Sequence, residues 1–126
     1  MKLEKQVVNL ELAKKLKELG FKQESLFYWS DGGELKTEEE YYNFMDYAES
    51  VGKPAGTEIQ KHYPAYTVAE LGEMLTDIQF TRKTHKNVKE KWVCYDDVFY
   101  NIKQLANTEA DARAKMLIYL KENKLI

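Results

Sequence analysis

The segment that most constrains the fold is residues 108–126, which reads TEADARAKMLIYLKENKLI. Thr108 is a helix-capping residue, and Asp111 stands three residues later, where an acidic side chain completes a capping-box-like pair. Acid-first pairs at i,i+4 spacing, Glu109/Arg113 and Asp111/Lys115, favour the same helix. The segment therefore predicts a helix over Glu109–Glu122. Its apolar stripe, expected in the core, is Ala110, Ala114, Leu117 and Leu120, with Met116 and Ile118 on its shoulders.

Three more helices are predicted from caps and apolar periodicity. They are Leu10–Leu19, which follows Asn9 and ends at Gly20, Glu38–Val51, which opens with the capping box Thr37/Glu40, and Val68–Leu75, which opens with the capping box Thr67/Glu70. The segment Leu12–Trp29 also fits a helix-turn-helix in part. Leu16 stands where that motif needs a small residue, however, and the end of the segment favours a strand.

Short aromatic and apolar runs predict three strands: Ser25–Ser30, Ile78–Thr84 and Trp92–Tyr95. The last two flank a charged connection and are interpreted as a β-hairpin. Residues 98–106 fit a strand or a helix equally well. Lys53–Gly56 is interpreted as a loop and Glu58–Tyr66 as a short strand interrupted by Pro64. We expect one α+β domain over residues 1–126, with a small antiparallel sheet of about three strands covered on one face by three to four helices.

Composition excludes several classes of protein. The longest apolar run, Met116–Leu120, is far shorter than the roughly 20 residues of a membrane span. The first residues lack the apolar region of a signal peptide, so we expect a cytoplasmic protein that does not enter a membrane. The single cysteine, Cys94, cannot form an intramolecular disulfide. The formal net charge of −2 gives no overall attraction to nucleic acid.

Reactive side chains are few and badly spaced for catalysis. His62, His85 and Cys94 show no metal-ligand spacing, so we expect no metal. A Cys94 nucleophile would need one of these histidines beside it, yet Cys94 sits inside a predicted strand among aromatic residues. No phosphate-binding glycine motif is present. We expect a protein that is not an enzyme and has no cofactor.

An acidic aromatic segment gives the first candidate binding surface. In the predicted helix Glu38–Val51, Tyr41, Phe44 and Met45 face the core. The residues expected outside, and proposed to bind a protein partner, are Glu38, Glu39, Tyr42, Asp46 and Tyr47. Aromatic side chains among exposed charges are typical anchors of protein interfaces. The leading hypothesis is therefore a non-enzymatic accessory or interaction protein with an unknown protein partner.

A basic segment in the predicted hairpin gives the second candidate surface. The alternative hypothesis is a nucleic-acid-binding module that uses Arg82, Lys83, Lys86, Lys89, Lys91 and Trp92. Phe80, Trp92 and Tyr95 flank these cations and would stack on bases. Lysines in a hairpin also serve solubility and block aggregation at sheet edges. Because one segment is acidic and the other basic, self-association between copies is a further alternative.

Three segments resemble a family of small uncharacterised proteins found in bacterial genomes and their phage or prophage regions. They are NLELAKKLKELGFKQESLFYW (residues 9–29), AYTVAELGEML (residues 65–75) and NTEADARAKMLIYLKENKLI (residues 107–126). The three segments together make up about 40% of the chain. It implies a shared fold and possible phage origin but no established activity, because the matching segments are helix caps and core stripes. The acidic and basic segments lie outside it.

Overall fold

The computed structural model describes residues 2–53, 55–75, 79–98 and 101–126. In chain order its elements are η1 (Leu3–Lys5), α1 (Leu10–Glu18), β1 (Phe27–Ser30), β2 (Leu35–Thr37), α2 (Glu38–Ser50), α3 (Ala55–Gln60), β3 (His62–Pro64), α4 (Val68–Met74), β4 (Gln79–Lys83), β5 (Trp92–Asp96), β6 (Lys103–Ala106) and α5 (Glu109–Glu122). The α+β class is confirmed. The four helices expected from the sequence begin where predicted and end within one residue of the prediction.

The strands form two antiparallel three-stranded sheets, in the orders β2-β1-β3 and β4-β5-β6. The expectation of one sheet is therefore wrong. β1 pairs with the nearby segments Leu35–Thr37 and His62–Pro64 instead of joining β4 and β5. Pro64 has no backbone N–H to donate, and β3 accordingly lies at a sheet edge. Of the predicted strand Ile78–Thr84, Ile78 lies outside the described residues.

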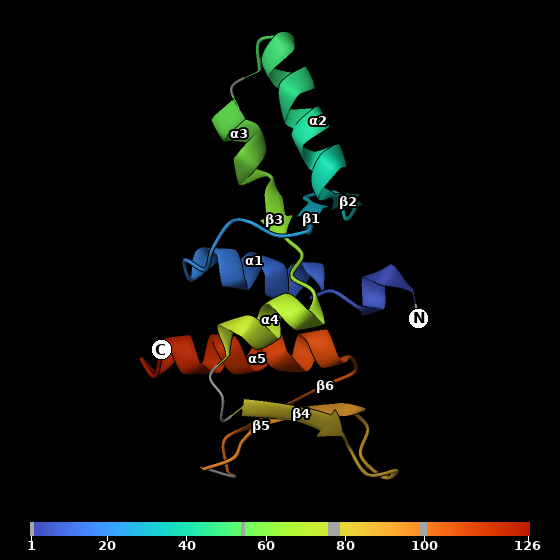
Figure 1. The fold of residues 1–126 in the computed structure, drawn as a ribbon, viewed down its shortest axis with the longest axis vertical. Helices are drawn as coiled ribbons and strands as arrows, with labels where there is room; N and C mark the ends of the chain where they lie inside the picture. Colours follow the sequence, from blue (N-terminus) through green and yellow to red (C-terminus); the bar gives the residue numbers. More distant parts are fainter. Residues whose placement is uncertain (1, 54, 76–78, 99–100) are drawn as a thin grey trace.

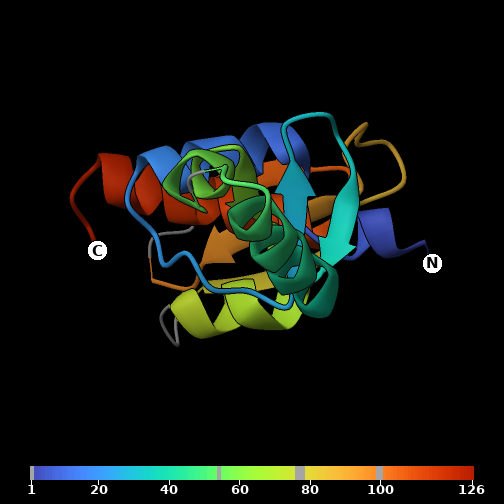
Figure 2. The same cartoon turned by 90° about the horizontal axis from the view of Figure 1, so that it is seen from above.

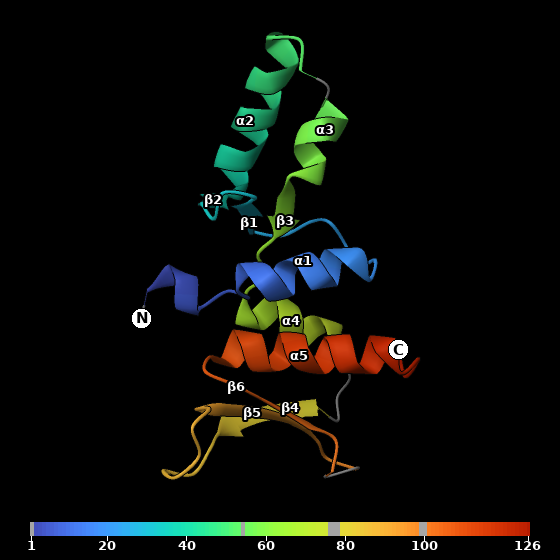
Figure 3. The ribbon, with the colours of Figure 1, turned by 180° about the vertical axis from the view of Figure 1, so that it is seen from behind.

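The molecule is built in layers along one axis. Helices α1, α4 and α5 lie between the two sheets, and α2 and α3 extend beyond β1–β3 as an arm (Figures 1 and 3). We call these two helices the α2–α3 arm. Seen from above, α1 and α4 lie on opposite sides of the molecule (Figure 2), and both contact α5. The expected arrangement, with every helix on one face of one sheet, is wrong because α1, α4 and α5 separate two sheets and α2 lies beyond one of them.

The last helix, α5, occupies the centre of this arrangement. It contacts α1 and α4 on one side and the β4-β5-β6 sheet on the other. The predicted stripe is confirmed as core, and Ala112, outside that stripe, is buried as well. A helix between two layers buries most of its circumference, which a one-sided stripe does not anticipate.

The predicted caps are present, with one change of partner. Thr37 and Thr67 form full capping boxes with Glu40 and Glu70. Thr108 accepts a hydrogen bond from the Asp111 backbone N–H, but the Asp111 carboxylate does not complete the box. It accepts from the backbone N–H and the side-chain amide of Asn9, at 2.8 and 3.0 Å, and so joins α5 to the start of α1.

One predicted ion pair and one predicted loop also differ from expectation. Lys115 donates to the Leu105 carbonyl at 2.8 Å and not to Asp111. The predicted loop Lys53–Gly56 contains the start of α3 at Ala55. Lys17 of α1 donates to the carbonyls of Ile59 and His62, at 2.7 and 2.8 Å, so a distant lysine secures the end of this short helix.

The remaining alternatives are decided by the backbone. After α1, Gly20 adopts a positive φ of 87° and the chain continues to β1, so a second helix of a helix-turn-helix does not follow. Residues 103–106 form β6, which agrees with the strand interpretation of residues 98–106. Residues 99–100 lie outside the described residues.

Candidate functional site

The predicted basic hairpin is formed by β4 and β5. Phe80 pairs with Tyr95, and Lys83 pairs with Trp92 at the end of the ladder. Beyond it, the Thr84 backbone N–H donates to the Lys91 carbonyl at 3.0 Å, and the Thr84 hydroxyl donates to the Glu90 carbonyl at 2.6 Å. These bonds close the connection, so its lysines project from an ordered turn.

Five of the six predicted nucleic-acid-binding residues surround one open hollow of about 590 Å³: Lys83, Lys86, Lys89, Lys91 and Trp92. The four lysines are exposed. The Lys83 ammonium lies 6.0 Å from the centre of the Trp92 ring, within the range of a cation–π contact. The described residues contain ion pairs between Lys15 and Glu122 and between Arg113 and Glu109, neither of which uses a lysine of the hairpin. The hollow is therefore positively charged.

The sixth residue, Arg82, lies on the face of the sheet directed away from α5. Side chains of paired residues share a face, so Phe80, Arg82 and Tyr95 stand together on this outer face. The rings of Phe80 and Tyr95 are 6.1 Å apart, and the Arg82 guanidinium lies 5.7 Å from the centre of the Tyr95 ring. Phe80 is 45% exposed, which is high for a phenylalanine in a strand.

Lys103 of β6 extends the outer face and was missed in the sequence. It pairs with Tyr95 across the sheet and lines, with Arg82 and Asp97, a second hollow of about 420 Å³. Asp97 contributes a carboxylate there. The available signal was the two-residue spacing of Lys103 and Leu105, which places both on one face of a strand, but it is useful only once residues 98–106 are assigned as a strand.

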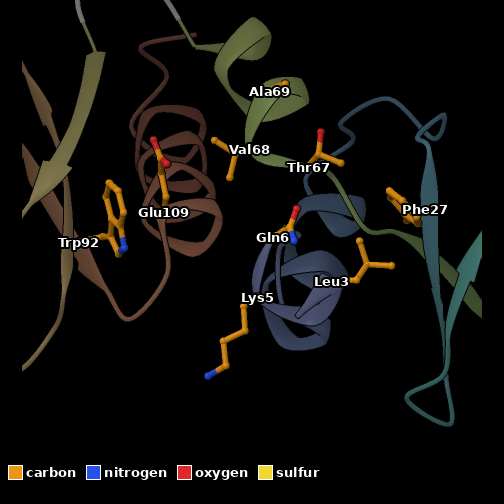
Figure 4. A pocket seen from close by; sticks show the side chains of 9 residues that line it. All are labelled: Leu3, Lys5, Gln6, Phe27, Thr67, Val68, Ala69, Trp92 and Glu109. Carbon is orange, nitrogen blue, oxygen red and sulfur yellow. The ribbon is translucent and has the colours of Figure 1, made fainter. Parts of the chain in front are cut away.

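Trp92 does not share the outer face with Phe80 and Tyr95, contrary to the expectation that all three flank the cations together. It pairs with Lys83 and Ala106 on the opposite face. There it reaches the end of an apolar groove of about 640 Å³ between the two sheets. Figure 4 shows Trp92 and Phe27 at opposite ends of this groove, with Gln6, Val68 and Glu109 between them.

Glu109 is held in place beside Trp92 by a polar network. Its Oε2 atom accepts from the Thr81 hydroxyl at 2.5 Å and from Nη2 of Arg113 at 3.2 Å. Nη2 of Arg113 also donates to the Thr81 hydroxyl at 3.2 Å, and Nη1 donates to the Val68 carbonyl at 3.0 Å. The network joins α5, α4 and β4 behind the groove.

The acidic surface lies on α2, at the other end of the molecule from the hairpin (Figure 1). The five predicted protein-binding residues, Glu38, Glu39, Tyr42, Asp46 and Tyr47, are all exposed. Tyr42 and Tyr47 are 50% and 62% exposed. On the opposite side of α2, Tyr41 stacks on Tyr28 of β1 with ring centres 3.9 Å apart. This stack belongs to a small apolar cluster separate from the main core.

His62 is buried beneath the arm, and its two ring nitrogens have partners that define one tautomer. Its Nδ1 lies 2.7 Å from the Glu58 carbonyl and its Nε2 lies 3.1 Å from the Lys36 ammonium. Because an ammonium only donates, Nε2 accepts and Nδ1 carries the proton. The pKa of His62 is lowered, and the largest cause is its burial, which disfavours the charged imidazolium. The imidazole therefore supports the arm as a neutral group.

The reactive side chains do not converge. Cys94 is buried in β5, whereas His62 belongs to β3 in the other sheet. Burial raises the pKa of the Cys94 thiol to about 12, which disfavours the thiolate that a nucleophile requires. Among the described residues, no three His, Cys, Asp or Glu side chains are grouped so that they could hold a metal ion.

The described helices are all too short or too polar to cross a bilayer. Comparisons with protein-family models, with curated proteins and with solved structures each found no match. Any functional conclusion therefore depends on the surfaces described above.

Proposed function

We propose that this protein is a non-enzymatic cytoplasmic binding protein that holds single-stranded nucleic acid on the β4-β5-β6 sheet and its basic hairpin. The observation that carries the proposal is the exposed ring of Phe80 next to the half-buried ring of Tyr95, beside Arg82 on the outer face. Exposed aromatic rings on an open sheet face are suitable for stacking unpaired bases, and neighbouring cations are suitable for phosphates.

Single strands fit this surface better than duplexes. A duplex hides the faces of its bases, so Phe80 and Tyr95 would have nothing to stack on. Each base stacked on an aromatic side chain contributes about 1–3 kcal/mol. The lysines of the hairpin would add sequence-independent phosphate contacts. These contacts weaken at high salt, because the release of counterions from the nucleic acid is then less favourable.

Fluorescence anisotropy with labelled single-stranded and double-stranded DNA and RNA tests the proposal. With about five phosphate contacts, affinity for a single strand should fall about 100-fold between 50 and 200 mM salt. The variant Lys86→Glu/Lys89→Glu/Lys91→Glu should lose at least tenfold in affinity. A matched variant with the same charge change at exposed lysines elsewhere, Lys2→Glu/Lys22→Glu/Lys53→Glu, should bind nearly as tightly as the original protein.

The aromatic pair is tested separately. Phe80→Ser should weaken single-strand binding by about tenfold, because one stacking platform is lost, and leave duplex binding unchanged. Absence of binding at 50 mM salt, or equal losses in the hairpin variant and its matched control, would contradict the proposal.

A second candidate function is protein binding through the α2–α3 arm. The observation that favours it is the exposure of Tyr42 and Tyr47 on a helix that extends from the body of the protein. A partner held by this surface should be lost in Tyr42→Ser/Tyr47→Ser and retained in the hairpin variant. The opposite pattern would assign that partner to the hairpin. Possible phage or prophage origin, suggested by the sequence resemblance, remains a prediction.

A further inference from the structure

The apolar groove and the basic hollow meet at one residue. Trp92 lines both, because it stands at the start of β5, directly after the hairpin turn. The exposed lysines 83, 86, 89 and 91 line the hollow with Trp92. The groove runs from Trp92 to Phe27 (Figure 4). A ligand that contacts the lysines can therefore continue past Trp92 into the groove.

The groove and the hollow have different chemistry. Leu3, Phe27 and Val68 give the groove apolar walls, and Glu109 places a carboxylate at its Trp92 end. Lys5 also lines the groove, so a phosphate there would meet one carboxylate and one lysine, whereas four exposed lysines surround the hollow and attract a phosphate more strongly. A flat, uncharged ring with N–H donors suits the groove, because it can stack on Trp92 and donate to the carboxylate. The volume, about 640 Å³, is ample for one planar base.

Glu109 is oriented before any ligand arrives. Both Thr81 and Arg113 donate to its Oε2 atom, and these two bonds fix the orientation of the carboxylate. Carboxylates accept hydrogen bonds from exocyclic amino groups, such as N4 of cytosine or N6 of adenine. Thymine and uracil present carbonyl oxygens at the corresponding positions, and these oxygens would face the carboxylate unfavourably.

We infer that the groove between η1, α4 and β5 is a pocket for one nucleobase, and that it prefers bases with an exocyclic amino group over thymine and uracil. The inference rests on the proposed function, since the phosphates that flank the bound base would lie on the basic hairpin. Trp92 provides the stacking surface and Glu109 provides the acceptor.

The first test compares the affinities of the protein for labelled oligo(dC), oligo(dA) and oligo(dT) of equal length. The pocket predicts that oligo(dC) and oligo(dA) bind about tenfold more tightly than oligo(dT), the scale of one good base contact. Glu109→Gln should reduce this preference to within about twofold, since an amide donates as well as accepts. Thermal unfolding of Glu109→Gln checks that the network with Arg113 still supports the fold.

The second test blocks the groove without touching the hairpin or Glu109. Ala69 is exposed at the groove, so Ala69→Trp should cover the entrance and abolish the base preference. Glu73→Trp adds the same ring to an exposed position of α4 that does not line the groove, and it should preserve the preference.

The outcomes separate the two proposals. Salt-dependent binding with equal affinities for all three oligonucleotides, or a preference that survives Ala69→Trp, would overturn the base pocket and leave the proposed function standing. Failure of every oligonucleotide to bind at low salt would overturn both. A preference for amino-bearing bases that disappears in Ala69→Trp and Glu109→Gln, but not in Glu73→Trp, would support both.

Discussion

Gly72 of α4 is a position where an apparently favourable substitution should destabilise the protein. Alanine normally stabilises a helix by about 1 kcal/mol relative to glycine. A β-carbon at Gly72, however, would overlap Nη1 of Arg113 and lie 3.4 Å from its Cζ. The guanidinium would have to move, although it is held by hydrogen bonds to the Val68 carbonyl, the Thr81 hydroxyl and Glu109.

The expected magnitude follows from those bonds. A hydrogen bond to a charged group contributes about 1.5–3 kcal/mol when it is buried. The side chains of Arg113 and Glu109 are 22% and 27% exposed, which favours the lower end of this range. Loss of one or two such bonds outweighs the gain in helix propensity. We predict that Gly72→Ala lowers the free energy of unfolding by about 0.5–2 kcal/mol, or about 2–8 °C in Tm for a chain of this length.

A double-mutant cycle isolates the cause. Urea unfolding, followed by circular dichroism, is measured for the original protein, Gly72→Ala, Arg113→Ala and the double variant. Without the guanidinium the methyl group has room, so Gly72→Ala should stabilise the Arg113→Ala background by about 1 kcal/mol. Stabilisation by Gly72→Ala in both backgrounds would refute the reasoning, because the methyl group would then not displace Arg113.

Three further predictions concern the core and the buried titratable groups. Leu117→Ala should lower the free energy of unfolding by about 2–5 kcal/mol, measured in urea, because Leu117 is fully buried in α5; an unchanged midpoint would contradict its place in the core. Cys94 should resist iodoacetamide at pH 8 until the protein is unfolded, because burial raises its pKa; rapid labelling of the native protein would refute this. Burial lowers the pKa of His62, so the unfolded chain binds this proton more readily and stability should fall as pH decreases through 6.5, the ordinary value. His62→Gln should reduce that dependence between pH 7.5 and 5.5, and an unchanged slope would exclude His62 as its source.

The helices were predictable because their signals are local. Thr37 with Glu40 and Thr67 with Glu70 contain the whole capping interaction within four residues. Asp111 shows where such reasoning ends. Its position fits a capping box, yet its carboxylate bonds to Asn9, a residue 102 positions away that only the folded chain brings near. The residues around Asp111 do not indicate that a distant side chain competes for its carboxylate.

The division into two sheets was not predictable from the strands themselves. β2 and β3 have three residues each, too few for a period-two pattern to stand out. Without them β1 had no local partners, and joining it to the hairpin was the simplest arrangement. The position of α5 between layers depends on the same missing strands, because they form the sheet on the far side of α1.

The candidate site was predictable in composition but not in geometry. The clustering of lysines in the sequence was enough to predict a basic segment, and the structure places four of these lysines around one hollow. Trp92 and Tyr95 are three residues apart in β5, so their side chains point to opposite faces of the sheet, and the register of β4 places Phe80 beside Tyr95. The groove beside Trp92 was invisible in the sequence because its walls come from η1, β1, α4, β5 and α5.

Backbone amide NMR during titration with a mixed-sequence single-stranded octanucleotide tests the central claim most directly. If the β4-β5-β6 sheet and its hairpin are the working surface, shifts should concentrate at residues 80–95 and 103–105 and should diminish as salt is raised. The amides of α2 should remain unchanged. A saturating titration whose shifts lie on the α2–α3 arm, or an absence of shifts at low salt, would contradict the account.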